Sequence, residues 1–199
     1  MKPADKDGPT SVVRLRIFVQ GDNIRIERVD AGQVIIARLK ENIVWSIDEK
    51  KGVYYEAALE EIATNWRNMR REKGIEEKEA SAVSLKRGGE RKSILWHDCD
   101  HYILDMDGKT LLEVWTDKDF DFPEKETIYE FRARMGELSP GVFQEIRKVQ
   151  GFPLRMNGFT YVGTESMVSL REVKSIQRQD IDAEKFKLPD GLRKTTVGE

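Results

Sequence analysis

The sequence has few of the residues on which metal and nucleophile chemistry most often depends. Its 199 residues include one cysteine and two histidines. A lone cysteine, Cys99, excludes a disulfide within the chain, and the two imidazoles, His97 and His101, leave few candidates for a general base. The chain also has no glycine-rich phosphate loop, no serine nucleophile elbow and no His–Glu zinc helix. These absences predict a protein that is not an enzyme and that needs no cofactor.

A strong excess of charge and a long apolar run are missing as well. The 34 basic residues are balanced by 36 acidic ones, so the composition indicates neither a nucleic-acid partner nor a polybasic membrane patch. No segment approaches the ~20 apolar residues that span a bilayer, so no transmembrane segment is expected. The first nine residues lack the apolar core of a secretory leader, which fits either a cytosolic start or a mature domain whose leader lies outside this sequence.

What the sequence does contain is a succession of short strand patterns before any helix. They occupy residues 12–19, 23–30, 33–39 and 42–48. The connections between them are so short that they join neighbouring strands, which predicts an antiparallel meander. Residues 34–37, Val-Ile-Ile-Ala, are apolar on both faces. This indicates a strand that is covered on both sides, or one that is covered on one side and lines a cavity on the other.

The rest of the chain predicts further strands and three helices. Strands are expected at residues 53–56, 80–86, 100–106, 109–116 and 159–174. Helices are expected at residues 57–73, 123–135 and 139–149, the last with Ser139 as N-cap. Hairpin turns are expected at Asp107-Gly108 and Asn157-Gly158, and a mobile loop around Gly88-Gly89. About ten strands and three helices predict an α+β fold with a long curved antiparallel sheet, in one domain over residues 11–199 after a flexible tail at 1–10.

The residues around Cys99 are the sharpest candidate for chemistry. In a strand, His97, Cys99 and His101 share one face, and two imidazoles with a thiolate are typical zinc ligands. Same-face positions lie ~6.5–7 Å apart, however, which suits a single small ion poorly. The preferred interpretation is therefore a surface segment or the entry to a strand, with one buried cysteine and no metal. A metal-dependent enzyme that uses these three residues is the distant alternative.

Apolar residues give the remaining candidate site. Aromatic side chains that recur on strands and helices are typical of pockets for apolar ligands, although they also form ordinary cores. In the ligand hypothesis, Trp45 on the sheet and Trp66 with Met69 on the first helix face a common apolar space. The residues predicted to line this cavity are Ile36, Trp45, Trp66, Met69, Trp115 and Phe143.

Several short segments carry a resemblance to a known family. They are Asn-Ile-Arg-Ile-Glu (23–27), Val-Trp-Ser-Ile-Asp (44–48), Val-Tyr-Tyr-Glu (53–56), Cys-Asp-His-Tyr (99–102), Leu-Glu-Val-Trp-Thr (112–116), Gly-Phe-Pro-Leu (151–154) and Phe-Lys-Leu-Pro-Asp-Gly (186–191). In their order the chain resembles the LolA-like and LppX-like bacterial lipoprotein carriers, and most of all their small relatives of unknown function. The sequence departs from the carriers in having no helix before its first strand and a charged excursion at residues 75–92.

The resemblance implies an open antiparallel half-barrel whose concave face is covered by three helices. It also implies a periplasmic or cell-envelope protein that binds a lipid, an acyl chain or a lipidated partner without catalysis, and an envelope protein as a further partner. A cytoplasmic location stays open. The rival hypothesis is a protein-interaction module of the same fold whose interior is filled and which takes no ligand.

Overall fold

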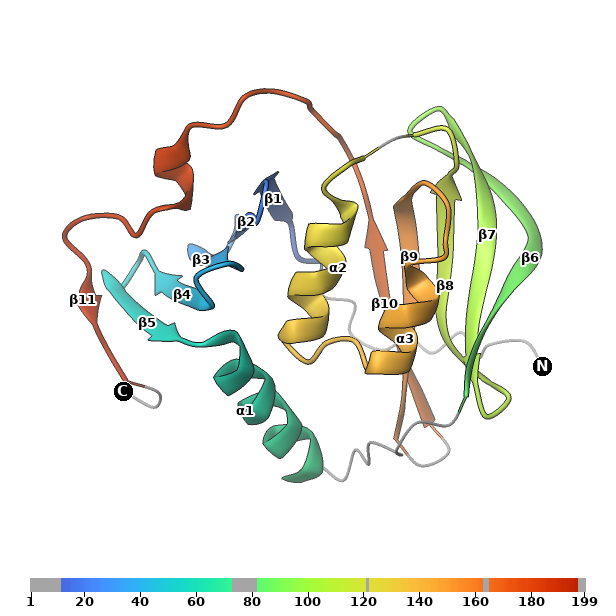
Figure 1. Cartoon of the computed structure of the whole chain (residues 1–199), viewed down its shortest axis with the longest axis horizontal. Helices are drawn as coiled ribbons and strands as arrows, with labels where there is room; N and C mark the ends of the chain where they lie inside the picture. Colours follow the sequence, from blue (N-terminus) through green and yellow to red (C-terminus); the bar gives the residue numbers. More distant parts are fainter. Residues whose placement is uncertain (1–11, 73–81, 121, 163–164, 197–199) are drawn as a thin grey trace.

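A computed structural model describes residues 12–72, 82–120, 122–162 and 165–196 (Figure 1). These residues form an α+β fold with eleven strands in two sheets and three α-helices. The first sheet, in the order β1-β2-β3-β4-β5-β11, consists of β1 (Leu15–Gln20), β2 (Asn23–Arg28), β3 (Gln33–Arg38), β4 (Ile43–Asp48), β5 (Val53–Ala57) and β11 (Arg193–Lys194). The second sheet, in the order β10-β9-β8-β7-β6, consists of β6 (Val83–Ile94), β7 (His97–Met106), β8 (Lys109–Asp117), β9 (Phe152–Val162) and β10 (Glu165–Glu172). The helices are α1 (Leu59–Glu72), α2 (Lys125–Arg134) and α3 (Pro140–Ile146).

The first five strands form the meander that their short connections predict. Each of them pairs antiparallel with the next, and β11 adds parallel to β5 at one edge. The register places Ile36 opposite Trp45, and Ala37 opposite Val44. Because successive side chains of a strand point to opposite faces, these two pairs lie on different faces of the first sheet.

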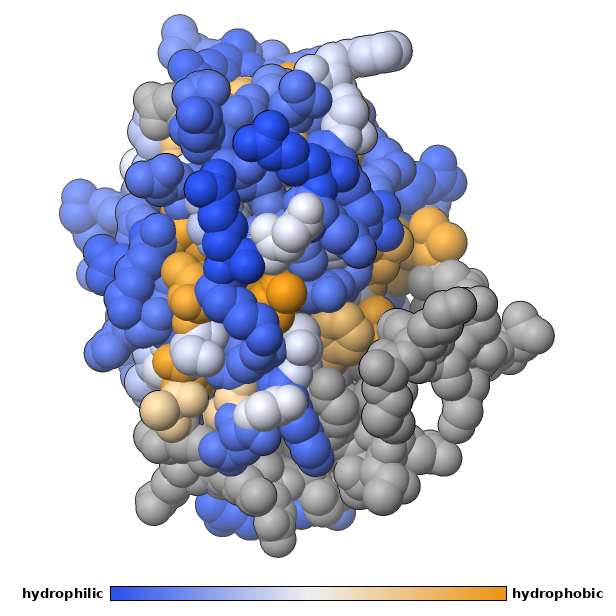
Figure 2. All heavy atoms as spheres, turned by 90° about the vertical axis from the view of Figure 1, so that its right-hand side faces the viewer, coloured by the Kyte–Doolittle hydropathy of each residue, from blue (hydrophilic) through white to orange (hydrophobic). Residues whose placement is uncertain are grey.

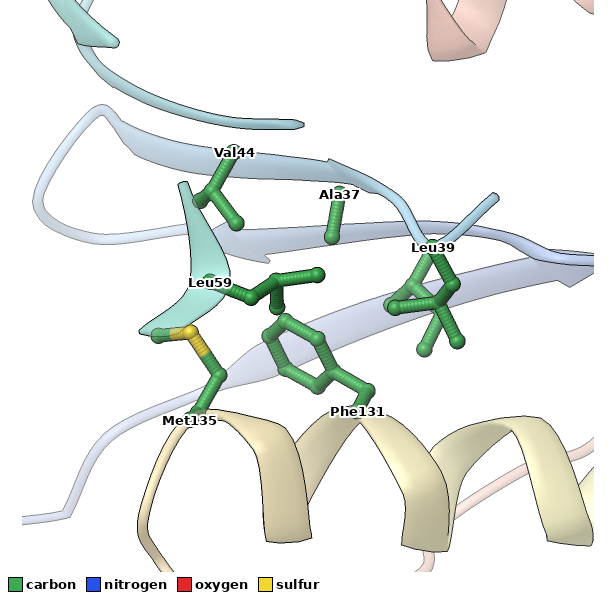
Figure 3. Close-up of a cluster of buried hydrophobic side chains, with 7 residues drawn as sticks. Ala37, Leu39, Val44, Leu59, Phe131 and Met135 are labelled. Carbon is green, nitrogen blue, oxygen red and sulfur yellow. The ribbon is translucent and has the colours of Figure 1, made fainter. Parts of the chain in front are cut away.

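The face that carries Ala37 and Val44 is covered by helices, and we call it the helix-facing side. Both residues are buried against Leu59 at the start of α1, against Phe131 of α2 and against Met135, which caps the C-terminal end of α2 (Figure 3). Phe131 and the C-cap residue Met135 are four positions apart, so they point to the same side of the helix. Burying an aliphatic or aromatic side chain of this size is worth about 1.5–3 kcal/mol, so this contact is a main source of stability.

The opposite face, which we call the outer side of the first sheet, is covered by the late part of the chain. Residues 181–192 cross it on the way to β11 (Figure 1). Phe186 at the end of the short 3-10 helix η1 (Ala183–Phe186) is buried against Ile36 and Trp45. The Asp182 carboxylate caps this helix by accepting a hydrogen bond from the Glu184 N–H at 3.0 Å. At Ile36 and Ala37, β3 is thus covered on both sides, which is the first of the two alternatives that the sequence left open.

Helices α2 and α3 lie between the two sheets (Figure 1). While Phe131 of α2 packs on the first sheet, Tyr129 packs on the second. There it joins a buried cluster that includes Leu104 and Val114 of the second sheet and Ile146 of α3. The helix-facing side of the second sheet is therefore filled by side chains.

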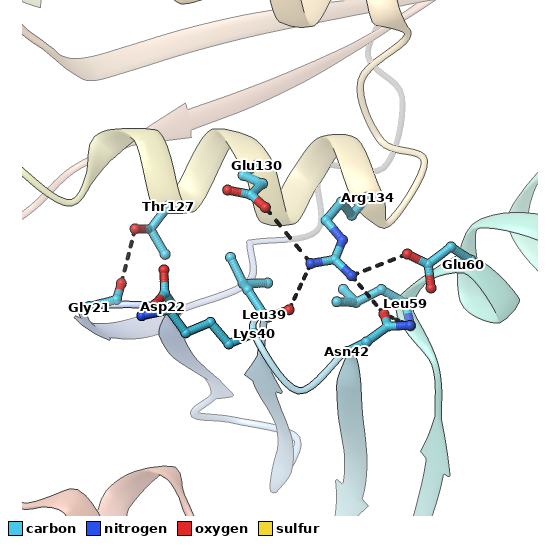
Figure 4. A network of polar contacts seen from close by, with 10 residues as sticks. All are labelled: Gly21, Asp22, Leu39, Lys40, Asn42, Leu59, Glu60, Thr127, Glu130 and Arg134. Carbon is cyan, nitrogen blue, oxygen red and sulfur yellow. Dashed lines mark hydrogen bonds and ion pairs between the residues drawn. The ribbon is translucent and has the colours of Figure 1, made fainter.

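Polar contacts fix α2 to the first sheet and to α1 (Figure 4). The Arg134 guanidinium donates to the carbonyl oxygen of Leu39 at 2.8 Å and to Oδ1 of Asn42 at 2.7 Å. It also pairs with the Glu60 carboxylate of α1 at 3.1 Å. Asn42 has a φ of 57°, which asparagine tolerates better than most residues, and its Oδ1 also accepts from the Leu59 N–H. One turn thus connects the first sheet with two helices.

Two of the predicted local signals are confirmed in detail. Asp107 and Gly108 connect β7 and β8 with φ angles of 53° and 74°, as a two-residue hairpin turn requires. The Ser139 hydroxyl accepts a hydrogen bond from the Val142 N–H at 3.4 Å and caps α3, with Pro140 in the first turn. Helix α3 ends at Ile146, however, earlier than predicted.

Two glycine signals were interpreted wrongly. Asn157 and Gly158 form no turn, because both lie inside β9, where they pair with β8 on one side and β10 on the other. The Asn157 amide donates to the Glu113 carboxylate at 2.9 Å, and a Cβ at position 158 would come within 2.8 Å of Ser169 Oγ. Glycine there permits a close approach of neighbouring strands instead of a reversal. The predicted loop at Gly88-Gly89 likewise belongs to a strand, β6, with a bulge.

Some predicted features fall outside the part of the chain that the structure describes. They include the tail predicted at residues 1–10, the last residue of the helix predicted at 57–73 and the first two residues of the strand predicted at 80–86. None of the helices in the described ranges is long and apolar enough to cross a bilayer.

Candidate functional site

The structure does not gather the six residues that were predicted to line one cavity. Ile36 and Trp45 lie together, but on the outer side of the first sheet, where Trp45 is only 9% exposed. The Trp45 indole N–H donates to the Glu56 carboxylate at 2.8 Å. The expectation that Trp45 faces the helices is wrong, because the alternation along β4 places Val44 there instead.

The other four residues lie in different surroundings. Trp115 is buried on the far side of the second sheet, and Phe143 of α3 packs against the cluster between α3 and that sheet. Met69 is half-buried on α1, and the side chain of Trp66 on the same helix lies outside the described residues. Each of the three described positions therefore belongs to a separate region.

A groove lies on the helix-facing side of the first sheet. Its floor is the row of side chains next to the row that the helices cover. The register aligns Ile26, Ile35, Ser46 and Tyr55 across β2 to β5, and these residues are half-buried or exposed. Next to them on edge strand β1, the side chain of Ile17 is 48% exposed. The groove has a volume of about 330 Å³. The groove therefore has an apolar floor and is open to solvent.

The end of the groove near the strand turns is polar. Arg28, Gln33, Asp48 and Lys51 line it, and the Arg28 guanidinium donates to the Gln33 side-chain oxygen at 2.7 Å. Toward α1, the Tyr55 hydroxyl donates to the Glu61 carboxylate at 2.6 Å, which raises the pKa of Tyr55. This phenol accordingly stays protonated at neutral pH. The arrangement presents two cations beside an apolar strip, a geometry suited to binding rather than to proton transfer.

Sequence reasoning missed this groove for an identifiable reason. The apolar residues at alternate positions 24, 26 and 35, 37 are visible in the sequence, but the row beneath the helices and the row beside them look alike. Only the position where α1 and α2 stop covering the sheet separates the two rows. The prediction was based on aromatic residues, and the one on this sheet, Trp45, lies on the outer side.

A second unusual group of side chains lies on the side of the second sheet that faces away from α2 and α3, which we call its outer side. His101, only 5% exposed, stacks on Trp115 with ring centroids 4.4 Å apart and planes 2° from parallel. Lys92 Nζ lies 4.0 Å from the centroid of the Trp115 ring, and the Arg155 guanidinium carbon lies 5.6 Å from it. The indole thus lies among one imidazole and two cations.

Gly88 makes room for this stack. A Cβ atom at position 88 would lie 2.1 Å from Nδ1 of His101, so only glycine lets the backbone of β6 pass over the ring. The bulge between Arg87 and Arg91 falls at the same place. What the sequence indicated as a mobile loop is therefore a close contact between a bulged strand and a buried histidine.

The three residues considered as a metal or nucleophile group have separate partners. His97 Nδ1 lies 2.7 Å from the Asp117 carboxylate, and burial raises the pKa of Cys99 to about 11, so its thiol stays protonated. Burial likewise lowers the pKa of His101, and Glu113, whose carboxylate is 3.9 Å away, opposes that shift. Neither His101 nitrogen has a hydrogen-bond partner among the described residues. Within the same residues, no group of three or more His, Cys, Asp or Glu side chains is arranged to hold a metal ion.

A comparison with known families gives one result. A model of the family described as "Domain of unknown function (DUF4412)" matches residues 11–192. No curated protein matches the chain. The match extends over nearly the whole sequence, from before β1 to the residue that precedes β11. The chain therefore belongs to the DUF4412 family.

Proposed function

We propose that this protein binds an amphiphile, such as a lipid, an acyl chain or a lipidated partner, in the groove of the first sheet and does so without catalysis. The observation that supports this is the apolar row on the helix-facing side that the helices cover only in part. It lies in a groove with a volume of about 330 Å³, which falls at the lower end of the usual range for small-molecule pockets. Ile26 and Ile35 form its floor.

The two ends of the groove suit the two ends of an amphiphile. An acyl chain on Ile26, Ile35 and Tyr55 removes apolar surface from water, at about 25 cal/mol for each Å² that is buried. A carboxylate or phosphate head then lies near the exposed cations of Arg28 and Lys51. Asp48 at the same end pairs with Lys51 at 4.0 Å, so Arg28 is the stronger candidate for the head group.

The architecture supports the same proposal. Two open sheets with helices between them are consistent with an open half-barrel, the fold that the resemblance to the LolA-like and LppX-like carriers implies. In this proposal the ligand contacts the residues that line the groove, instead of the six residues that were predicted to line a cavity. A periplasmic or cell-envelope location accompanies the proposal, since lipid and lipidated proteins are the ligands that such a carrier meets there.

The rival function is an interaction module that takes no ligand. It is supported by the filling of the space between the sheets, where Phe131 packs on one side of α2 and Tyr129 on the other. In that case the groove is only an irregularity of the surface, and the protein acts through its free strand edges.

Ligand uptake by the purified protein separates the two. We expect native mass spectrometry and organic extraction to recover co-purified lipid, and oleic acid or lysophosphatidylglycerol to raise the Tm. A ligand at 100 times its Kd stabilises the folded state by about 2.7 kcal/mol. Ser46→Trp fills the groove from an exposed position and should abolish the shift.

The matched control is Ser84→Trp, which adds the same ring at an exposed position of β6 in the other sheet. It should leave the shift intact. An empty protein whose Tm no amphiphile changes, or a Ser46→Trp variant that still takes up ligand, contradicts the proposal and favours the interaction module.

A further inference from the structure

The turn between β6 and β7 exposes the most accessible aromatic side chain among the described residues. Trp96 is 99% exposed, at a position where the chain reverses in two residues. Both turn residues have positive φ angles, 52° at Leu95 and 68° at Trp96. Such a turn favours asparagine and glycine, and bulky residues adopt it at a cost in free energy. Neither packing nor backbone preference therefore accounts for a tryptophan there.

Further aromatic rings gather at the same end of the second sheet. His97, next to Trp96, contacts the Phe120 ring edge-on with centroids 5.2 Å apart. Phe120 and Phe122, in the segment that follows β8, pack on Phe152 at the start of β9, with centroids 6.2 Å and 4.4 Å apart. Phe120, Phe122 and Phe152 are half-buried, so this end keeps aromatic surface in contact with solvent.

Cations lie directly behind the turn. A pocket of about 320 Å³ is bounded by Leu95 of the turn and by Lys92, Arg155 and Lys174. One carboxylate, Glu172, also lines it, and it pairs with Arg155 at 3.0 Å and with Lys174. The three cations outnumber the one carboxylate, although Lys92 also pairs with Glu90 at 3.4 Å outside the pocket. The lining thus carries a net positive charge.

We propose that this end of the second sheet docks on a phospholipid bilayer, with Trp96 inserted between the head groups and Lys92, Arg155 and Lys174 placed near lipid phosphates. Tryptophan concentrates at the membrane–water boundary because its ring is apolar while its N–H is polar. Basic residues near the surface add an attraction to anionic lipid. The proposal goes beyond ligand binding in the first sheet and does not depend on it.

The shape of the turn favours a bilayer over a protein partner. A stable protein interface buries about 800 Å² on each side, and a two-residue turn that projects one ring offers much less. The side of the molecule formed by β6 and β7 is mostly hydrophilic, with its apolar groups scattered (Figure 2). A bilayer needs only the tip to enter. The exposed carboxylates of Asp98 and Asp119 near the tip keep this attachment weak and reversible.

Vesicle binding by the full chain tests the proposal. We expect the protein to co-sediment with phosphatidylcholine vesicles that contain phosphatidylglycerol, with weaker binding to phosphatidylcholine alone, and its tryptophan emission to shift to shorter wavelength. Trp96→Gly removes the ring and suits the positive φ, so it should fold normally and weaken binding about tenfold. Lys174→Glu, at an exposed position, should reduce only the part that depends on phosphatidylglycerol.

Two controls keep this result separate from the groove. Val168→Ser removes a side chain that is 56% exposed on β10 and should not alter vesicle binding. Ser46→Trp should also leave it unchanged, even where it abolishes ligand uptake. The proposal is overturned if the wild-type chain ignores both kinds of vesicle, if Trp96→Gly binds as tightly as wild type, or if Trp96 is needed only for capture of a soluble protein.

Discussion

Each of the two sheets has one well-covered face and one partly open face. The open face lies on the side of the helices in the first sheet and on the opposite side in the second. In the first sheet the outer side is sealed by residues 181–192, and the opening lies on the helix-facing side. In the second sheet the helix-facing side is filled by α2 and α3, and the opening is a pocket lined by Lys92 and Arg155, both of which lie over the Trp115 ring on the outer side. The first sheet, whose outer side is covered by a segment distant in sequence, thus has its solvent-exposed groove on the same side as the helices. The second sheet packs its helix-facing side against α2 and α3, and its unusual side chains lie on the outer side.

The largest effect should come from removing the cover of the first sheet. Phe186→Ala leaves a cavity over Ile36 and Trp45, and truncating a buried phenylalanine costs about 3–5 kcal/mol. Ile176→Ala, in the looser cover of the second sheet, should cost clearly less because Ile176 is only half-buried. Urea unfolding followed by circular dichroism measures both. Equal losses for the two variants would remove the asymmetry between the sheets.

A medium effect should come from the bulge over His101. Gly88→Ala places a methyl group where the imidazole lies, and overpacking of this kind costs about 1–3 kcal/mol. Gly89→Ala is the matched control, since a Cβ there meets nothing within 4 Å. In a His101→Ala background the Gly88→Ala change should become much less costly, which a double-mutant cycle of unfolding free energies measures. Additive losses would show that the two residues do not compete for space.

The smallest effect should be a pH dependence that belongs to the second sheet alone. Burial lowers the pKa of His101 below its ordinary value of 6.5, so the unfolded chain binds a proton at a higher pH than the folded one. At pH values well above 6.5, this histidine contributes no pH dependence to the free energy of unfolding. As the pH falls below 6.5, the unfolded chain is protonated first, so stability is lost until the pH passes the pKa of His101 in the folded protein.

Unfolding free energies at pH 7.5 and pH 5.5 measure this dependence. Glu113 and Glu90 oppose the shift of the His101 pKa and Lys92 supports it, so the slope is a balance of these charges. His101→Gln should flatten the curve in this interval. A wild-type protein whose stability rises on acidification would contradict the assigned direction.

The sequence predicted those parts of the fold that local rules determine. The meander followed from short connections, the turn at Asp107-Gly108 from its φ preference, and the start of α3 from Ser139. The two wrong glycine predictions share a cause. Gly88 and Gly158 serve contacts across strands, with His101 and Ser169, and such contacts leave no local signature in the sequence.

The candidate site was less accessible to prediction for a similar reason. Alternation in β4 showed that Trp45 and Val44 face opposite sides, but not which of these sides receives the helices. That choice depends on η1, whose Phe186 packs on the Trp45 side and leaves the Val44 side to α1 and α2. The groove then follows from how far the helices reach along the sheet, which is a property of the packed structure.

The late cover of the first sheet also has a consequence for biosynthesis. Strands β1 to β5 are made early, yet η1 and β11, which cover and extend their sheet, are made after the whole second sheet. Until residues 181–194 have been synthesised, the side chains of Ile36 and Trp45 stay exposed on a nascent chain. Contacts of such high sequence separation form slowly, and exposed apolar strands favour aggregation. A chain truncated before η1 should therefore engage chaperones even though every strand of its meander is complete.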